Sequence, residues 1–208
     1  MKASLRGAKR QGKSAILVLS LLISACSYTV PLRSPLGQAP LVEQAPISIA
    51  IRYEEGLRNH KCTVSSDIFA NWLIELGPPS IEMFDLAFSA LFNKVIPLGS
   101  GVKEQAAAGQ YPIIEVRLLE FDGCEAHTQI LRSIEVAYEA TLHDNDGTLI
   151  ARWQGRGRAG MGAFREKIDS GDLTGYLSAV TSLAMRRAAA DFIINFEQDP
   201  SIMAWLQR

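Results

Sequence analysis

The stretch IEVAYEATLHDNDGTLIARWQ, residues 134–154, decides the fold. Apolar and polar residues alternate over 134–142, which is typical of a strand with one buried face. Residues 144–147, Asp-Asn-Asp-Gly, predict a tight turn, because asparagine and glycine tolerate the positive φ that such turns need. Residues 148–154 then return as the partner strand. We therefore expect a β-hairpin at the centre of the domain.

Other segments on both sides of this hairpin carry clear periodicities. Residues 47–53 and 114–121 alternate like strands, and 63–76 fits either a strand or a short helix. Apolar residues recur every three or four positions over 81–95 and again over 173–196, which predicts two amphipathic helices.

This order of elements predicts the α+β class. We expect a mostly antiparallel sheet of about four strands, with two helices packed on one face. Residues 77–80, Gly-Pro-Pro-Ser, predict a turn in which Ser80 is the N-cap of the first helix. The apolar tail 202–206 is expected to dock on the core, and the alternative is a plug that binds a partner.

An export signal precedes the domain. Residues 1–13 contain five basic residues and no acidic one, and 15–23 are almost wholly apolar before Ser24-Ala25-Cys26. The apolar run is too short for a membrane-spanning helix, which needs about 20 residues. We therefore expect residues 1–25 to be a signal peptide that is removed.

The segment Ile23-Ser24-Ala25-Cys26 resembles the lipobox of bacterial lipoproteins. The resemblance implies that Cys26 is acylated, with palmitate-type chains, and becomes the first residue of a lipid-anchored protein. Because Ser27 follows and not aspartate, it also implies the outer membrane, facing the periplasm. The alternative is an ordinary signal peptide whose cleavage after Ala25 leaves a cysteine.

The mature chain divides into a tether and one domain. Residues 26–46 contain the anchor cysteine and four prolines without any apolar period, which predicts an extended tether of up to about 60 Å. Residues 47–208 are expected to form a single periplasmic domain, because the length suits one core.

Charge argues against nucleic acid as a partner. The chain has 21 basic and 22 acidic residues, and removal of the five basic residues of the signal leaves 16 against 22, a net charge of −6. A protein that binds a phosphate backbone needs a basic face.

Cys62 and Cys124 remain after Cys26 is acylated. In an oxidising compartment two such thiols favour a disulfide, which would stabilise the fold by about 4 kcal/mol. The alternatives are a zinc site, in which His60 and His127 join the two cysteines, and two unlinked thiols. We expect no metal.

Residues 155–160, Gly-Arg-Gly-Arg-Ala-Gly, match the G-x-G-x-x-G pattern. A dinucleotide site would need a helix starting there and a returning parallel strand, and neither is predicted. We therefore expect no cofactor, and interpret the glycines as a flexible or bulged strand end.

Four arginines in the same region, Arg152, Arg156, Arg158 and Arg165, concentrate basic charge in an acidic domain. One interpretation is a binding site for an anion such as a lipid phosphate. The other is a solvated strand edge that is kept positive to discourage pairing with other sheets.

The catalytic motifs G-x-S-x-G and H-E-x-x-H are absent from the sequence. Over residues 47–198 the order of strands and helices is similar to the lipopolysaccharide-assembly lipoprotein and to auxiliary lipoproteins of ABC-type lipid transporters. The likeness implies a non-enzymatic envelope lipoprotein that serves an assembly or transport complex. The alternative is a periplasmic binding module for lipid or another anionic ligand, and a hydrolytic enzyme is a third hypothesis.

Overall fold

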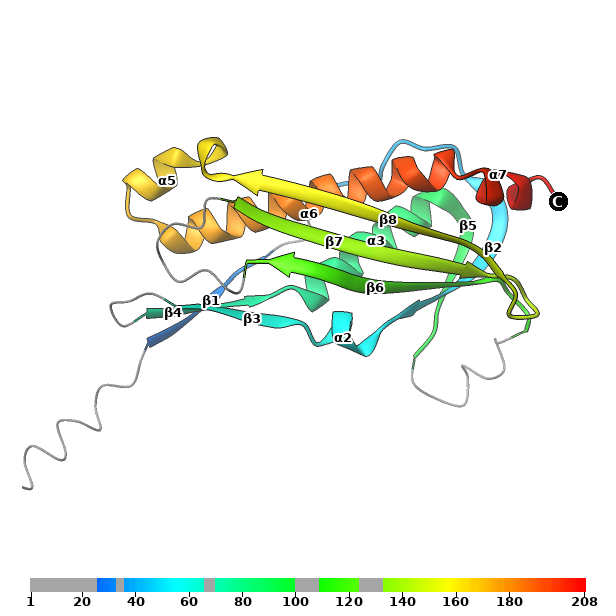
Figure 1. Cartoon of the computed structure of the whole chain (residues 1–208), viewed down its shortest axis with the longest axis horizontal. Coiled ribbons are helices and arrows are strands. Elements are labelled where there is room, and N and C mark those ends of the chain that lie inside the picture. Colours follow the sequence, from blue (N-terminus) through cyan, green and yellow to red (C-terminus); the bar gives the residue numbers. More distant parts are fainter. Residues whose placement is uncertain (1–25, 33–35, 66–69, 100–108, 124–132) are drawn as a thin grey trace, which may run out of the picture.

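The computed structural model describes residues 26–32, 36–65, 70–99, 109–123 and 133–208. Within these residues, eight strands form two sheets and five α-helices pack beside them (Figure 1). The strands are β1 Cys26–Val30, β2 Ala45–Tyr53, β3 Lys61–Ser65, β4 Ala70–Glu75, β5 Phe92–Pro97, β6 Ile113–Asp122, β7 Ser133–His143 and β8 Leu149–Gly160. The helices are α2 Glu55–Arg58, α3 Gly77–Leu91, α5 Arg165–Asp169, α6 Leu173–Gln198 and α7 Pro200–Leu206, and η1 Met161–Ala163 is a 3-10 turn.

The two sheets both mix parallel and antiparallel pairs. The larger sheet has the order β5-β2-β6-β7-β8, and the smaller has the order β1-β4-β3. β2 pairs in parallel with β5 and β6, whereas the pairs β6-β7 and β7-β8 are antiparallel. The predicted α+β class is confirmed, but the prediction of one mostly antiparallel sheet of about four strands is wrong, since each of the two sheets has as many parallel as antiparallel pairs. Parallel neighbours need crossover connections, which α2, β3, β4 and α3 supply between β2 and β5.

The two long helices share one core against the larger sheet. An aromatic cluster joins them to it: the ring of Phe84 on α3 lies 5.0 Å from Tyr138 on β7 and 4.9 Å from Phe192 on α6. Phe192 in turn lies 5.2 Å from Trp153 on β8. Each pair stabilises the core by about 1 kcal/mol beyond its buried area. The prediction that both helices pack on one face of the sheet is confirmed.

The bounds of the first helix differ from the prediction. α3 begins at Gly77, four residues before the expected start, because its prolines lie in the first turn, where a missing N–H is tolerated. Ser80 is therefore not an N-cap; its hydroxyl donates to the Leu76 carbonyl at 2.7 Å and lies 2.8 Å from the Tyr138 hydroxyl. The helix ends at Leu91, and the residues expected to continue it form β5, which pairs with β2.

The predicted hairpin is confirmed as β7 and β8, with Gly147 in its turn at a φ of 86°. β8, however, continues six residues beyond the predicted end at Gln154. The interpretation of the glycines as a flexible or bulged strand end is wrong, since Gly155 and Gly157 are paired with β7 and buried.

These two glycines let α6 approach the strand closely. A Cβ atom at Gly157 would lie less than 3.0 Å from the carbonyl oxygen of Ala184 and the backbone nitrogen of Ala188. A Cβ atom at Gly155 would meet Ala188 and Phe192 as closely. Only glycine permits this approach, so the residues of the G-x-G pattern are helix-packing positions.

The segment 63–76, which fitted a strand or a helix, forms the strands β3 and β4 of the smaller sheet. The expected tether over residues 26–46 is partly a strand as well. β1 pairs along its whole length with β4, Val30 is only 2% exposed, and the Ser178 hydroxyl of α6 donates to the Pro31 carbonyl at 2.6 Å. The first described residues therefore belong to the folded body.

The C-terminal tail docks on the core, as predicted. It forms α7, whose first backbone N–H groups at Ser201 and Ile202 are capped by the Asp199 carboxylate. Ile202 and Trp205 are buried.

Replacement of Gly157 by alanine tests the close packing of α6 on β8. The added methyl group must displace helix backbone, so Gly157→Ala is expected to lower the free energy of unfolding by about 2–3 kcal/mol. Chemical denaturation measures this loss. Gly162→Ala is the matched control, since a Cβ atom there meets nothing within 4 Å. Equal stability of the two variants would contradict the proposed reason for the glycines.

Candidate functional site

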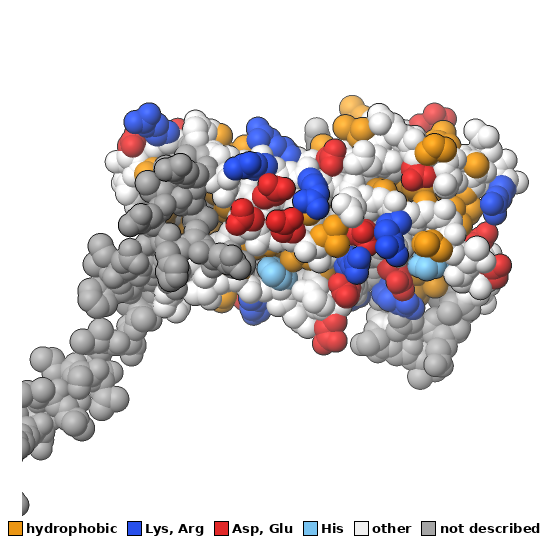
Figure 2. All heavy atoms as spheres, viewed as in Figure 1, with side chains coloured by type: hydrophobic (Ala, Val, Ile, Leu, Met, Phe, Trp, Pro, Cys, Tyr) orange, Lys and Arg blue, Asp and Glu red, His pale blue; other side chains and the backbone are white. Residues whose placement is uncertain are grey.

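The larger sheet has one face that the long helices do not cover. Along β8 the exposed side chains alternate with buried ones that face α6. On β7 residues 136–140 are all buried, so Glu139 is buried although it shares a face with Thr141. Figure 2 shows acidic and basic side chains gathered on this face. We call it the outer face. Its residues over the centre of the sheet are Arg52, Glu115, Arg117, Glu139, Thr141, Arg152, Gln154 and Arg156.

The strand register arranges these side chains in rows across the sheet. Arg52, Glu115, Thr141 and Arg152 are successive partners on β2, β6, β7 and β8. Arg117, Glu139 and Gln154 form the next row. Opposite charges on neighbouring strands stabilise a sheet, by about 0.2–1 kcal/mol a pair. The rows therefore give a fixed pattern of charges of both signs.

Glu139 is the centre of this pattern. It is only 4% exposed, and Arg117 donates to one of its carboxylate oxygens at 2.9 Å and 2.6 Å. Gln154 donates to the other oxygen at 3.0 Å, and the Arg152 guanidinium lies 3.8 Å away. Burial acts to raise the pKa of this carboxyl, but the hydrogen bonds from Gln154 and Arg117 and the two arginine charges outweigh it. The pKa of Glu139 therefore lies below its ordinary value.

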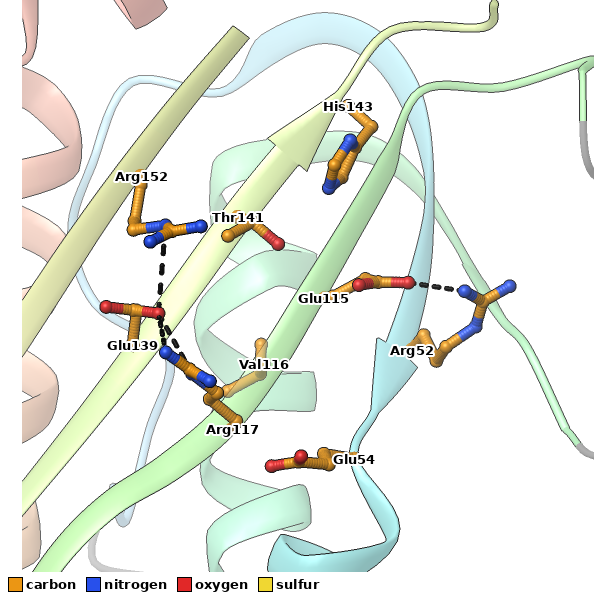
Figure 3. A pocket seen from close by; sticks show the side chains of 9 residues that line it. All are labelled: Arg52, Glu54, Glu115, Val116, Arg117, Glu139, Thr141, His143 and Arg152. Atoms are coloured by element: carbon orange, nitrogen blue, oxygen red, sulfur yellow. Dashed lines mark hydrogen bonds and ion pairs between the residues drawn. The ribbon is translucent and has the colours of Figure 1, made fainter. Parts of the chain in front are cut away.

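A shallow pocket of about 310 Å³ opens in the outer face beside Glu139 (Figure 3). Glu115 is paired with Arg52 at one side of it, and His143 lies at the end near the hairpin turn, with its Nδ1 3.2 Å from the Gly147 carbonyl oxygen. Arg117 and Arg152 both reach Glu139 from the neighbouring strands. Among the described residues, no group of three or more His, Cys, Asp and Glu is placed to hold a metal ion. The arrangement offers preformed charges for recognition.

Three of the four predicted arginines lie on β8, and Arg165 lies apart on α5, 3.8 Å from Asp169. Arg156 contacts Glu120 at 3.0 Å and Glu135 at 3.6 Å, and Arg158 donates to the Ser133 hydroxyl at 2.8 Å. Carboxylates thus balance much of the basic charge that the sequence concentrates here. Anion binding by this group stays a prediction.

The free edge of β8 is covered by side chains of α6, which the sequence analysis missed. The Arg158 carbonyl accepts from Arg187 at 2.5 Å, the Arg156 N–H donates to Asp191 at 2.9 Å, and the Gln154 carbonyl accepts from Asn195 at 2.8 Å. The three helix residues are spaced by four, so they share one face of α6. The spacing of these polar residues could have indicated a contact face on the helix. The sequence does not show, however, that β8 is the strand beside that face.

The cysteines are only partly visible in the structure. Cys62 lies on β3 and is 4% exposed, whereas Cys124 and His127 lie outside the described residues. His60 contacts Phe121 edge to face at 5.8 Å, so the residue before β3 lies beside the end of β6. The disulfide and the zinc site stay predictions.

Cys26 is the first residue of β1, and its side chain is not described. The structure therefore does not test its acylation. In the described part of the chain, no helix combines the length and apolar composition that crossing a membrane requires.

No protein-family model and no curated protein matches the chain. An uncharacterized protein of known structure is 14% identical, with a TM-score of 0.40 over 83% of this chain and 97% of the other. The hypothetical protein CT253 from Chlamydia trachomatis is 11% identical, with a TM-score of 0.40 over 78% and 96%. Lipoprotein GNA1162 from Neisseria meningitidis is 12% identical, with a TM-score of 0.32 over 65% and 99%. Likenesses this low carry no argument about function.

Replacement of Glu139 by glutamine tests the central charge network. Glu139→Gln removes the negative charge that accepts hydrogen bonds from Arg117 and Gln154 and attracts Arg152. We therefore expect the free energy of unfolding near pH 7 to fall by about 2 kcal/mol. Because the folded pKa is lowered, ionised Glu139 stabilises the fold above its unfolded pKa, and this contribution is lost as the pH falls through the folded pKa. The stability difference from the unaltered protein should therefore shrink below about pH 4. Denaturation curves at several pH values measure it.

Glu115→Gln is the control, because Glu115 and its partner Arg52 are both more than a third exposed. An exposed pair contributes at most about 1 kcal/mol. A pH-independent difference for Glu139→Gln would contradict the assignment of its pKa.

Proposed function

We propose that the protein is an envelope lipoprotein, anchored through acylated Cys26 to the outer membrane and facing the periplasm. It acts without catalysis, as an accessory component of an assembly or transport complex, and contacts its partner through the outer face. The observation that carries the partner contact is the preorganised row of charges around Glu139.

The anchor is supported by the sequence alone. A basic segment, a short apolar run and Ser24-Ala25-Cys26 follow one another at the spacing of a lipoprotein signal. Several acyl chains on one residue hold a protein at a membrane, since each buried methylene contributes about 0.8 kcal/mol.

The outer face supports recognition of a protein partner. Its charges of both signs are held by the sheet and by one another, so a partner with the complementary pattern loses little conformational entropy in binding it. Such patterns favour specific and salt-sensitive association. The paired state of Arg152 and Arg156 supports this reading over a site for a simple anion, which would have to compete with Glu139 and Glu120.

Acylation is tested by growth with labelled palmitate in a Gram-negative host. The unaltered protein is expected to carry the label and to sediment with membranes, whereas Cys26→Ala should do neither. Cys62→Ala is the control and should keep the label, because the lipobox resemblance involves only Cys26. Label on the Cys26→Ala protein, or none on the unaltered one, would refute the anchor.

The docking surface is tested by exchange of an ion pair. In the double variant Arg52→Glu/Glu115→Arg the two residues still attract each other, but the charges that a partner meets are reversed. With a photo-crosslinking residue at Thr141, we expect one envelope protein to be captured by the unaltered face. The double variant should capture about tenfold less, because like charges then oppose each other.

The matched control exchanges Lys61 and Glu75, a pair on the smaller sheet with an N–O distance of 2.7 Å. Lys61→Glu/Glu75→Lys should leave the crosslink unchanged. If lipid copurifies and no protein is captured, the ligand-binding alternative is favoured instead.

A further inference from the structure

The residue that carries the anchor in the proposed function is itself part of the fold. β1 starts at Cys26 and pairs in parallel with β4 at every position, from Cys26 opposite Ala70 to Val30 opposite Ile74. No free residue separates the anchor from the smaller sheet. The acyl chains would therefore hold this end of the domain directly at the bilayer.

β1 is fixed to the rest of the molecule on two sides. β4 supplies its backbone partners, and the Ser178 hydroxyl of α6 binds the carbonyl of Pro31, the next residue after the strand. The strand is buried at Val30, 2% exposed, and open at Tyr28, 50% exposed. Burial thus decreases toward Cys26, so the strand reaches the surface at its anchor end.

Tyr28 is the exposed aromatic residue nearest to the anchor. Its ring stacks on Trp72 at 6.3 Å, with an interplanar angle of 25°. Trp72 is held in place by a hydrogen bond from its indole nitrogen to the Thr174 hydroxyl at 3.2 Å. The tyrosine ring is therefore ordered before it meets any ligand, which lowers the entropic cost of binding.

The distance between Tyr28 and Cys26 is similar to the thickness of the headgroup layer. Tyr28 lies two residues from Cys26, which is about 7 Å along a strand. The polar layer of each leaflet is about 5–7 Å thick. Tyrosine and tryptophan favour this layer because they combine an apolar ring with a polar group.

We infer that the Cys26 end of the smaller sheet, with Tyr28 stacked on Trp72, is a membrane-facing surface that binds the headgroup layer of a lipid bilayer. The domain is then held on the membrane in one orientation, with the hairpin turn at the far end. This inference rests on the proposed function, in which Cys26 is acylated.

The test uses the full-length lipidated protein in vesicles of phosphatidylethanolamine and phosphatidylglycerol with a nitroxide quencher attached near the headgroups. A tryptophan is introduced by Tyr28→Trp, and its quenching is taken as the difference from the unaltered protein with its three tryptophans. We expect it to lose about half or more of its emission, since it lies at the depth of the quencher.

Leu149→Trp is the matched control. Leu149 is also 50% exposed, but it begins β8 at the hairpin turn, which lies at the opposite end of the molecule from β1 in Figure 1. Its quenching should stay at background. A spacer of eight serine and glycine residues inserted after Cys26, beginning with serine, should reduce the quenching at position 28 toward that of the control.

The outcomes separate the two proposals. If palmitate is incorporated but positions 28 and 149 are quenched alike, or the spacer changes nothing, the membrane-facing surface is refuted and the anchor stands. If no palmitate is incorporated, the proposed function itself fails. If Tyr28→Trp does not fold, as judged by circular dichroism, Thr29→Trp at the next exposed position is the probe and is read in the same way.

Discussion

The structure depends on the close approach of α6 to β8. Gly155 and Gly157 carry no side chain where the helix backbone passes, so Ala184 and Ala188 of α6 lie directly on the strand. The helix of 26 residues is about 39 Å long, and the strand of 12 residues is about 40 Å long. The helix lies along the strand from Arg158, whose carbonyl accepts from Arg187, to Trp153, whose ring lies 5.4 Å from Phe196. It also brings Phe192 into the aromatic cluster that α3 and β7 complete.

This contact determines where the polar side chains of the sheet can lie. Side chains of a strand alternate between faces, so all of β8 that does not pack on α6 points to the outer face. The same alternation on β6 and β7 gathers carboxylates and guanidinium groups there, and they satisfy one another. Glu139 can be nearly buried only because Arg117 and Gln154 reach it from the two neighbouring strands. The packing of one face and the charge network of the other therefore have the same origin.

Residue periodicity and turn residues predicted the elements whose structure depends mainly on neighbouring positions in the sequence. The alternation over 134–142 predicted β7, the Asp-Gly turn predicted the hairpin, and the apolar period predicted most of α6. Non-local contacts explain the failures. Phe92 and Val95 continue the period of α3, yet pairing with β2 makes them a strand. From the sequence, the glycines after Gln154 suggest a flexible strand end. The structure shows that they give the backbone of α6 room to lie against β8. In the site, the four arginines were found, but their carboxylate partners come from other strands, and Glu139 was missed because alternation alone suggests an ordinary exposed glutamate.

The α6 side chains that hydrogen-bond the edge of β8 affect whether copies of the chain can pair with one another. An edge strand with unpaired N–H and C=O groups is a template on which identical chains can add in register. If the proposed anchor confines the chain to a membrane, copies would meet more often, and an open edge would favour growth of ordered aggregates. Arg187, Asp191 and Asn195 already fill the positions that an incoming strand would need. Addition would first require these three hydrogen bonds to break, so the covered edge opposes pairing with another copy of the chain.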